Sequence, residues 1–198
     1  MHAYACSFAV AGVGPGDRVL DLGAGTGYGA TLLARLVGQG GHVRAVELDG
    51  RLAARARALL DEPAMAGPAL VTVIAGDALD PSTWAAEAPY DRVVLGFAVE
   101  ALPDPLLDAV REGGVAVAPV GPPGGPQELV RHVRRGDRWE VSSLGRVRYV
   151  AARTMADLAA PAPLPSMARS VVEDQGASGG PSANAGSERR RRSLAVTR

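Results

Sequence analysis

The chain has 198 residues, of which 47 % are hydrophobic and 4 % aromatic, and its formal net charge is zero. That length accommodates one α/β domain with a tail and leaves little room for a second domain. Zero net charge argues against a protein that binds nucleic acid through bulk electrostatics.

Apolar runs alternate with helical patterns along the first 155 residues. Strands are predicted, in chain order, at Arg18–Leu22, His42–Glu47, Leu70–Ala75, Arg92–Phe97 and Val115–Val120. Helices are predicted between them, at residues 28–37, at Arg51–Leu60 and in a short segment that ends with Leu106–Val110. A hairpin is then predicted from Gln127–Arg135 and Trp139–Val150, turning at Gly136–Asp137. This alternation implies an α/β fold with a Rossmann-like, doubly wound and mostly parallel sheet that ends in an antiparallel hairpin.

The composition changes near residue 155. Pro, Gly, Ser and Arg dominate from there on, and residues 189–192 are four consecutive arginines. We predict one domain over residues 1–155 and a disordered tail over residues 156–198, most clearly from about residue 160, because such a segment buries too little apolar surface. The arginine run is either a solvated tail end or a contact for an acidic partner or RNA.

The cysteine count and the hydropathy pattern limit the compartment. Cys6 is the only cysteine, which excludes an intramolecular disulfide and a multi-cysteine zinc site. No apolar run approaches the roughly 18 residues of a membrane span, and the first residues show no secretory signal. We therefore expect a cytoplasmic monomer that holds no metal and binds neither membrane nor nucleic acid.

The most informative segment is the glycine-rich run Asp21–Gly27, which follows a predicted strand and opens a predicted helix. Open α/β sheets bind ligands at this place, and glycines let the backbone approach a ligand without a Cβ in the way. A dinucleotide requires the pattern Gly-x-Gly-x-x-Gly here, but Tyr28 occupies the position of the third glycine. The dinucleotide fingerprint therefore fails.

The charge of Asp21 favours a different ligand. A carboxylate at the strand tip repels a pyrophosphate but attracts the α-ammonium group of a methionine moiety. Opposite charges about 4 Å apart at a partly dry site interact by roughly a few kcal/mol. The loop therefore favours S-adenosylmethionine over NAD, and an NAD-dependent oxidoreductase is the lesser alternative.

Two further acids follow successive predicted strands. Glu47 closes the second strand, where a carboxylate can accept hydrogen bonds from both ribose hydroxyls of an adenosine, or can simply be a solubilising charge. Asp77, with Ala78 after it, follows the third strand and can accept a hydrogen bond from an adenine amino group, or can cap a helix. Three such acids together with the glycine turn are more specific than any one of them.

Several segments resemble the protein-L-isoaspartate (D-aspartate) O-methyltransferase family. Met1–Ala5 is similar to the end of its Ser-Ala-Pro-His-Met-His-Ala motif, and Val19–Tyr28 is similar to its cofactor loop. Further similarity lies in Ala88–Asp91 before the fourth strand, in Gly113–Gly121 with Gln127–Leu129, and in Arg146–Val150, which resembles its closing strand. The resemblance covers about residues 1–152.

The resemblance implies the class I fold of S-adenosylmethionine-dependent methyltransferases. It implies that Asp21 to Gly25 line the methionine part of the cofactor, that Glu47 holds the ribose, and that Asp77 with Ala78 faces the adenine. His2 falls on a histidine of the family's cofactor site, or is a terminal residue without a role. The cofactor-binding set is thus His2, Asp21, Leu22, Gly23, Ala24, Gly25, Gly27, Glu47, Asp77 and Ala78.

Three departures from the family pattern bear on activity. The sequence starts inside the Ser-Ala-Pro-His-Met-His-Ala motif, so the family's serine and the helices that close over the substrate are expected to be missing. Glu100 stands where the family usually shows proline. Ala151–Arg153 stands where the family shows Pro-Leu-Thr.

The resemblance implies methylation of L-isoaspartyl residues in damaged proteins or peptides, which starts their repair through a succinimide. A carboxylate with an ordinary pKa near about 4 is already ionised at neutral pH, so no general base is needed and no catalytic residue is predicted. Two alternatives stay open. One is methylation of an ordinary aspartate in a ribosomally made peptide, and the other is a catalytically impaired chain that only binds the cofactor.

Overall fold

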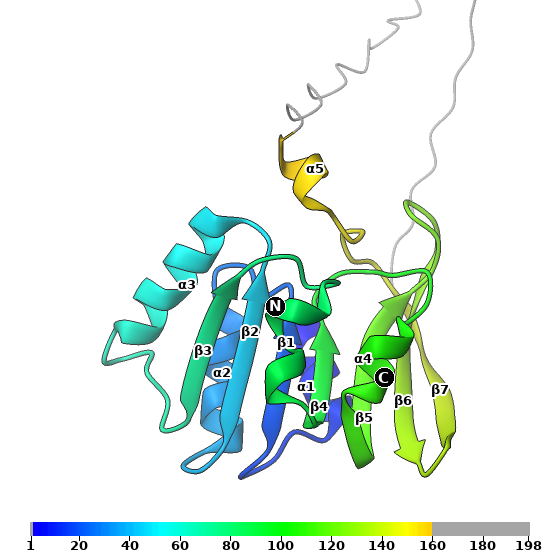
Figure 1. The fold of residues 1–198 in the computed structure, drawn as a ribbon, viewed down its shortest axis with the longest axis horizontal. Coiled ribbons are helices and arrows are strands. Elements are labelled where there is room, and N and C mark those ends of the chain that lie inside the picture. Colours follow the sequence, from blue (N-terminus) through cyan, green and yellow to red (C-terminus); the bar gives the residue numbers. More distant parts are fainter. Residues whose placement is uncertain (1, 160–198) are drawn as a thin grey trace, which may run out of the picture. The chain divides into compact units, whose positions relative to one another are not determined.

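Seven strands form one sheet, in the order β3-β2-β1-β4-β5-β6-β7, in the computed structural model, which describes residues 2–159 (Figure 1). The strands are β1 (Arg18–Leu22), β2 (His42–Glu47), β3 (Leu70–Ala75), β4 (Tyr90–Leu95), β5 (Val110–Val120), β6 (Gln127–Arg135) and β7 (Arg138–Val147). The helices are α1 (His2–Ala11), α2 (Tyr28–Val37), α3 (Gly50–Asp61), α4 (Asp104–Asp108) and α5 (Met155–Ala159), with short 3-10 turns η1 (Pro81–Thr83) and η2 (Ala85–Glu87).

The first five strands run parallel, and β6 and β7 are antiparallel to their neighbours. β1 lies between β2 and β4, with Asp21 opposite Ala45 on one side and opposite Val94 on the other. The strand order therefore reverses beside β1, and ligands of open α/β sheets bind at such a switch point, outside the carboxyl ends of the strands. The predicted α/β fold, mostly parallel with a C-terminal hairpin, is confirmed.

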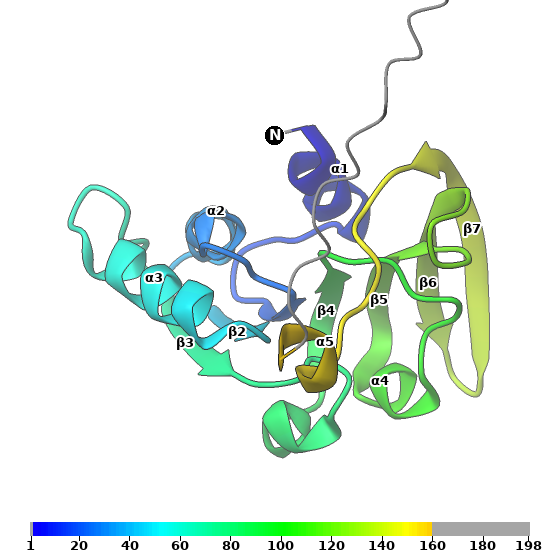
Figure 2. The ribbon, with the colours of Figure 1, turned by 90° about the horizontal axis from the view of Figure 1, so that it is seen from above.

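Side chains of the strands alternate between two apolar layers, one on each face of the sheet. Val19 belongs to the layer covered by α1, α2 and α3, whereas Leu20 belongs to the layer covered by α4 and the η turns. Figure 2 shows these two groups of helices on opposite sides of the sheet. Because Asp21 alternates with Val19 and Glu47 with Ala45, both acids face the side of α2.

The predicted bounds of strands and helices agree with the structure where a glycine or a charged residue ends an apolar run. β1, β2, β3 and α2 have the predicted bounds. β4 begins and ends two residues earlier than predicted, and β5 begins at Val110, which the sequence analysis placed in a helix. Val110 pairs with Tyr90 ahead of a register shift, and Gly113 adopts a φ of +72° there. The glycine that looked like a strand boundary is thus an irregularity inside a longer strand.

Helix α1 was not predicted. Its ten residues are almost uniformly apolar, so no helical periodicity distinguishes the face that packs. Phe8 and Ala11 are buried in the same layer as Val19, and Gly12, with a φ of +67°, follows the last turn. None of the helices within residues 2–159 has the length and apolar character of a membrane span.

The start of the predicted tail is helical. Thr154 and Asp157 form a reciprocal cap at the start of α5: the Thr154 N–H donates to Oδ2 of Asp157 at 2.7 Å, and the Asp157 N–H donates to Oγ1 of Thr154 at 3.4 Å. This local cap stabilises the helical turn α5 at the start of the predicted tail, and the division into a domain and a disordered tail stays a prediction. The predicted disorder of residues 160–198 and the arginine run lie outside the described residues.

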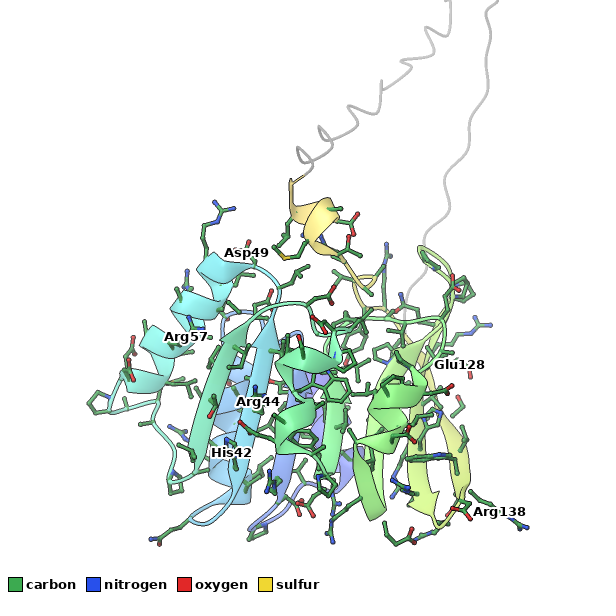
Figure 3. The ribbon with its side chains drawn as sticks, in the orientation of Figure 1. His42, Arg44, Asp49, Arg57, Glu128 and Arg138 are labelled. Carbon is green, nitrogen blue, oxygen red and sulfur yellow. The ribbon has the colours of Figure 1, made fainter. Side chains whose placement is uncertain are left out.

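Charged residues at the amino ends of the parallel strands form ion pairs. Glu87 pairs with Arg44 and lies 3.4 Å from Nδ1 of His42, and Asp17 lies 3.4 Å from Nε of Arg92. Figure 3 labels His42 and Arg44 along β2, far below Asp49 at the start of α3. Acids at this end of the sheet thus have cationic partners.

Candidate active site

A cavity of about 280 Å³ opens at the carboxyl ends of β1 to β4. Five of the ten residues predicted to bind the cofactor line it: Gly23, Gly25, Glu47, Asp77 and Ala78. The remaining wall comes from residues that were not predicted: Leu48, Leu52, Leu79, Gly96, Phe97, Val150, Ala151 and Arg153. Segments from four strand ends and from the closing stretch after β7 therefore build one site.

The glycine turn is held in a conformation that other residues do not tolerate. Gly23 has a φ of +81°, and a Cβ at this position would lie 2.7 Å from Cδ1 of Phe97. The N–H groups of Gly23 and Ala24 both donate to the Val46 carbonyl, at 2.8 and 3.1 Å. Gly25 has a φ of +57° and no neighbour within 4 Å of a Cβ position, so it presents bare backbone to the cavity.

Glu47 connects the glycine turn to the start of α3. Its Oε2 accepts a hydrogen bond from the Gly25 N–H at 2.7 Å, and its Oε1 accepts one from the Asp49 N–H at 3.0 Å. The side chain is 9 % exposed, through the cavity that it lines. A carboxylate has about four acceptor sites, so both oxygens retain capacity for hydroxyl donors from a ligand.

Asp21 is fully buried behind the glycine turn, and neither of its carboxylate oxygens has a hydrogen-bond partner within residues 2–159. Burial, and after it repulsion from Glu47, raises the pKa of Asp21 to about 7. A buried carboxylate without a cation is costly, so a positive charge placed against the turn would stabilise its ionised form. This unpaired acid fits the ammonium group of an amino-acid moiety.

Asp21 lies deeper than the cavity wall. The sequence predicts contact between its carboxylate and the ligand, and this stays a prediction, since the residue is fully buried and does not line the cavity. The alternation along β1 turns Asp21, with Val19, into the layer beneath α2. Its charge therefore acts on the cavity through the turn, without contact in this structure.

Asp77 and Ala78 line the cavity at the end of β3. Oδ1 of Asp77 accepts a hydrogen bond from the Leu79 N–H at 2.8 Å, which closes a local turn. The alternative role as a helix cap belongs to Asp80, which accepts from the Ser82 N–H at the start of η1. The Ala78 carbonyl accepts from Nε1 of Trp84 at 3.1 Å, so a buried indole fixes this stretch of the wall.

The other predicted residues lie outside the wall. Leu22 is part of the apolar layer under α4, and Ala24 is buried in the layer under α2. Gly27 is the N-cap residue of α2 and has a φ of +85°, and a Cβ there would lie 2.7 Å from Cβ of Ala56 in α3. These three residues shape the turn and its packing. His2 begins α1, but its side chain lies outside the described part of the chain.

The wall residues that were missed come from loops without a motif of their own. Ala98 pairs with Ala151 as an isolated parallel bridge: the Ala98 N–H donates to the Val150 carbonyl at 2.7 Å, and the Ala152 N–H donates to the Ala98 carbonyl at 2.9 Å. The side-chain amide of Gln127 holds the same stretch, because its Nε2 donates to the Tyr149 carbonyl at 3.0 Å and its Oε1 accepts from the Tyr149 N–H at 2.7 Å. Only the pairing of distant segments places these residues, and apart from the family resemblance at Ala151–Arg153 no local pattern indicates them.

The doubly wound sheet with a glycine turn after β1 defines a class I methyltransferase fold. The family described as protein-L-isoaspartate(D-aspartate) O-methyltransferase matches residues 1–156. The chain belongs to that family, as its resemblance suggested.

Individual relatives agree with this assignment. A protein-L-isoaspartate O-methyltransferase of Methylorubrum populi is 40 % identical over 137 residues, which are 69 % of this chain and 60 % of that protein. A solved protein-L-isoaspartate O-methyltransferase superimposes with a TM-score of 0.67 at 23 % identity, covering 77 % of this chain and 47 % of the other. A Plasmodium falciparum structure assigned to the family, in complex with S-adenosyl-L-homocysteine, superimposes with a TM-score of 0.65 at 19 % identity and covers 77 % and 73 %. The chain thus spans 60 % of the length of its Methylorubrum relative.

Proposed function

We propose that this chain is an S-adenosylmethionine-dependent carboxyl O-methyltransferase that acts on L-isoaspartyl residues of proteins or peptides. The observation that carries the proposal is the set of acids at the carboxyl ends of the strands. Within residues 2–159, Asp21, Glu47 and Asp77 have no cationic partner; Glu47 and Asp77 line a cavity with a bare glycine turn, and Asp21 is buried behind that turn. Membership of the family and the bound S-adenosyl-L-homocysteine of a relative support the same ligand.

The cavity offers a partner for each part of S-adenosylmethionine. The backbone of Gly23 and Gly25 would lie along the methionine part, with the buried charge of Asp21 behind it. Glu47 would accept hydrogen bonds from the ribose hydroxyls, and Asp77 with Ala78 would face the adenine. The bound cofactor supplies an electrophilic methyl group on a positively charged sulfur.

The chain's own contribution to the reaction is placement. The acceptor carboxylate is already ionised at neutral pH, so the site needs no proton acceptor. Phe97 and Val150 give the cavity wall apolar surface, which would limit the contact of a bound cofactor with water. Holding oxygen, methyl carbon and sulfur in line at about 3–3.5 Å is the main rate-enhancing effect open to such a site. Arg153 is the cation in the wall, and it would attract the acceptor carboxylate.

Methyl transfer to paired peptides tests the proposal. The chain is incubated with methyl-labelled S-adenosylmethionine and either an isoaspartyl peptide or the same peptide with an ordinary aspartyl linkage. We expect an alkali-labile methyl ester on the isoaspartyl peptide alone. We expect Glu47→Gln to weaken cofactor binding. The control is Glu140→Gln, which should leave cofactor binding unchanged, because Glu140 is an exposed residue of β7 that pairs with Arg135 far from the cavity.

Other outcomes identify the alternatives. Ester formation on the ordinary aspartyl peptide would replace the proposal with a peptide-tailoring enzyme. Cofactor affinity measured by calorimetry, without ester on either peptide, would leave a chain that only binds S-adenosylmethionine.

A cytoplasmic location, a monomeric state and the lack of a nucleic-acid partner stay predictions from composition.

A further inference from the structure

A second cavity, also of about 280 Å³, adjoins the candidate active site. Leu79 and Ala151 line both cavities. The second cavity lies against the loop that follows β4 and against the segment that follows β5. The cofactor placed in the first cavity has no need of this space, which is therefore available to the acceptor.

The wall of the second cavity is apolar except at one residue. Val99, Pro103, Pro123 and Ala152 are among the residues that supply the apolar surface. Glu100 is the charged residue of the wall, and it is exposed. Within the described part of the chain, no arginine pairs with it, unlike Glu87 at the other end of the sheet.

The backbone around Glu100 is fixed relative to the active site. The Val99 N–H donates to the Pro119 carbonyl at 3.0 Å, and the Gly121 N–H donates to the Val99 carbonyl at 2.9 Å. One residue earlier, the Ala98 N–H donates to Val150 at 2.7 Å. The bonds of the two residues before Glu100 therefore hold the start of this loop at a defined place beside Ala151.

A lysine or arginine side chain matches this combination of surfaces. Its alkyl stem can lie on apolar wall atoms while its charged tip stays near solvent and meets a carboxylate. An acidic side chain would meet a like charge, and a purely apolar one would leave Glu100 unpaired. Resting on the proposed function, we propose that the second cavity binds a basic side chain next to the methylated residue, and that Glu100 selects acceptors by this charge.

Three isoaspartyl peptides of equal length test this subsite, with Lys, Gln or Glu on both sides of the isoaspartyl residue. We expect kcat/KM of the wild-type chain to favour the Lys peptide over the Glu peptide by about fivefold, the scale of a partly exposed ion pair, and to lose the preference at high salt. Glu100→Gln removes most of the preference and Glu100→Lys reverses it. Glu140→Gln, the same change at a distant exposed site, keeps it.

Binding of the same peptides to the chain loaded with S-adenosyl-L-homocysteine, measured by calorimetry, separates the two proposals. Suppose that the Gln peptide is methylated, but the ratio of kcat/KM for the Lys peptide to that for the Glu peptide is the same in the wild type and in Glu100→Gln. That result overturns the subsite and keeps the proposed function. Suppose instead that the wild-type chain binds the Lys peptide preferentially, that Glu100→Gln abolishes this preference, and that no peptide is methylated. That result overturns the function and keeps the subsite. Absence of both binding and methylation overturns both.

Discussion

At the amino ends of the parallel strands, Glu87 lies between Arg44 and His42, and Asp17 lies beside Arg92. At the carboxyl ends of the same strands, Glu47 accepts only backbone N–H groups, and Asp21 has no partner within residues 2–159. One end therefore neutralises its charges within the protein, whereas the other keeps negative charge around a cavity. The difference indicates that the first end contributes to stability and that the second is organised for a cationic ligand.

The largest effect is expected when the free energy of unfolding of the wild type and of Asp21→Asn is compared at pH 5 and at pH 8. The pKa of Asp21 is raised from 3.8 to about 7 in the folded state, so the stability that its protonated form contributes is complete below about pH 4 and is lost as the pH rises through 7. A shift of this size corresponds to at most about 4 kcal/mol. The variant removes this pH dependence from denaturant-unfolding curves and weakens binding of S-adenosylmethionine.

Asp137→Asn is the control for this prediction, since it neutralises an exposed acid in the turn between β6 and β7. It is expected to leave both the pH dependence and the cofactor affinity as in the wild type. An unchanged pH dependence in Asp21→Asn would contradict the description of Asp21 as an unpaired buried acid.

Gly23→Ala and Gly25→Ala differ in the contacts of the added methyl group. Both positions have positive φ, which costs an alanine about 1 kcal/mol. At Gly23 the methyl group also overlaps Phe97, so we expect a total loss of about 2–4 kcal/mol in the free energy of unfolding. At Gly25 the methyl group enters the open cavity, and the main effect is lower cofactor affinity. Equal destabilisation by the two variants would show that the Phe97 contact does not hold the turn.

Glu87→Gln probes the opposite end of the sheet and has the smallest expected effect. It removes the partner of Arg44, whose side chain is only 11 % exposed, and lowers the free energy of unfolding by about 1–2 kcal/mol. Calorimetry should show unchanged affinity for S-adenosylmethionine, because Glu87 is not part of the cavity wall. A loss of cofactor-binding free energy larger than the loss of unfolding free energy would contradict the assignment of stability to the amino ends of the strands and of ligand binding to their carboxyl ends.

Local patterns were sufficient for the parallel sheet and its glycine turn. β1, β2 and β3 are short apolar runs with clear ends, and the acids at or near these ends mark the ligand edge. The pattern did not show how deep Asp21 lies, because depth depends on the face to which β1 turns its side chain. Helix α1 escaped prediction because an evenly apolar helix has no period.

The missed part of the site has a different cause. Phe97, Val150 and Arg153 reach the cavity only because the stretch after β7 crosses back beside the loop after β4. Gln127 fixes that crossing with two hydrogen bonds to Tyr149; the family resemblance includes Gln127–Leu129, but the sequence does not indicate this structural role of the glutamine. Contacts of this kind, between residues 98 and 151, follow from the folded arrangement and not from neighbours in the chain.

The Gln127 bonds also have a consequence for the order of events during synthesis. The glycine turn, Glu47 and Asp77 all emerge in the first half of the chain, but the wall that faces them is supplied by residues 150–153. A nascent chain in which only the parallel strands have been made has an incomplete cofactor site, because residues 150–153 are still missing from its wall. We therefore expect full affinity for the cofactor only after β7 has been made and the segment that follows it has folded back.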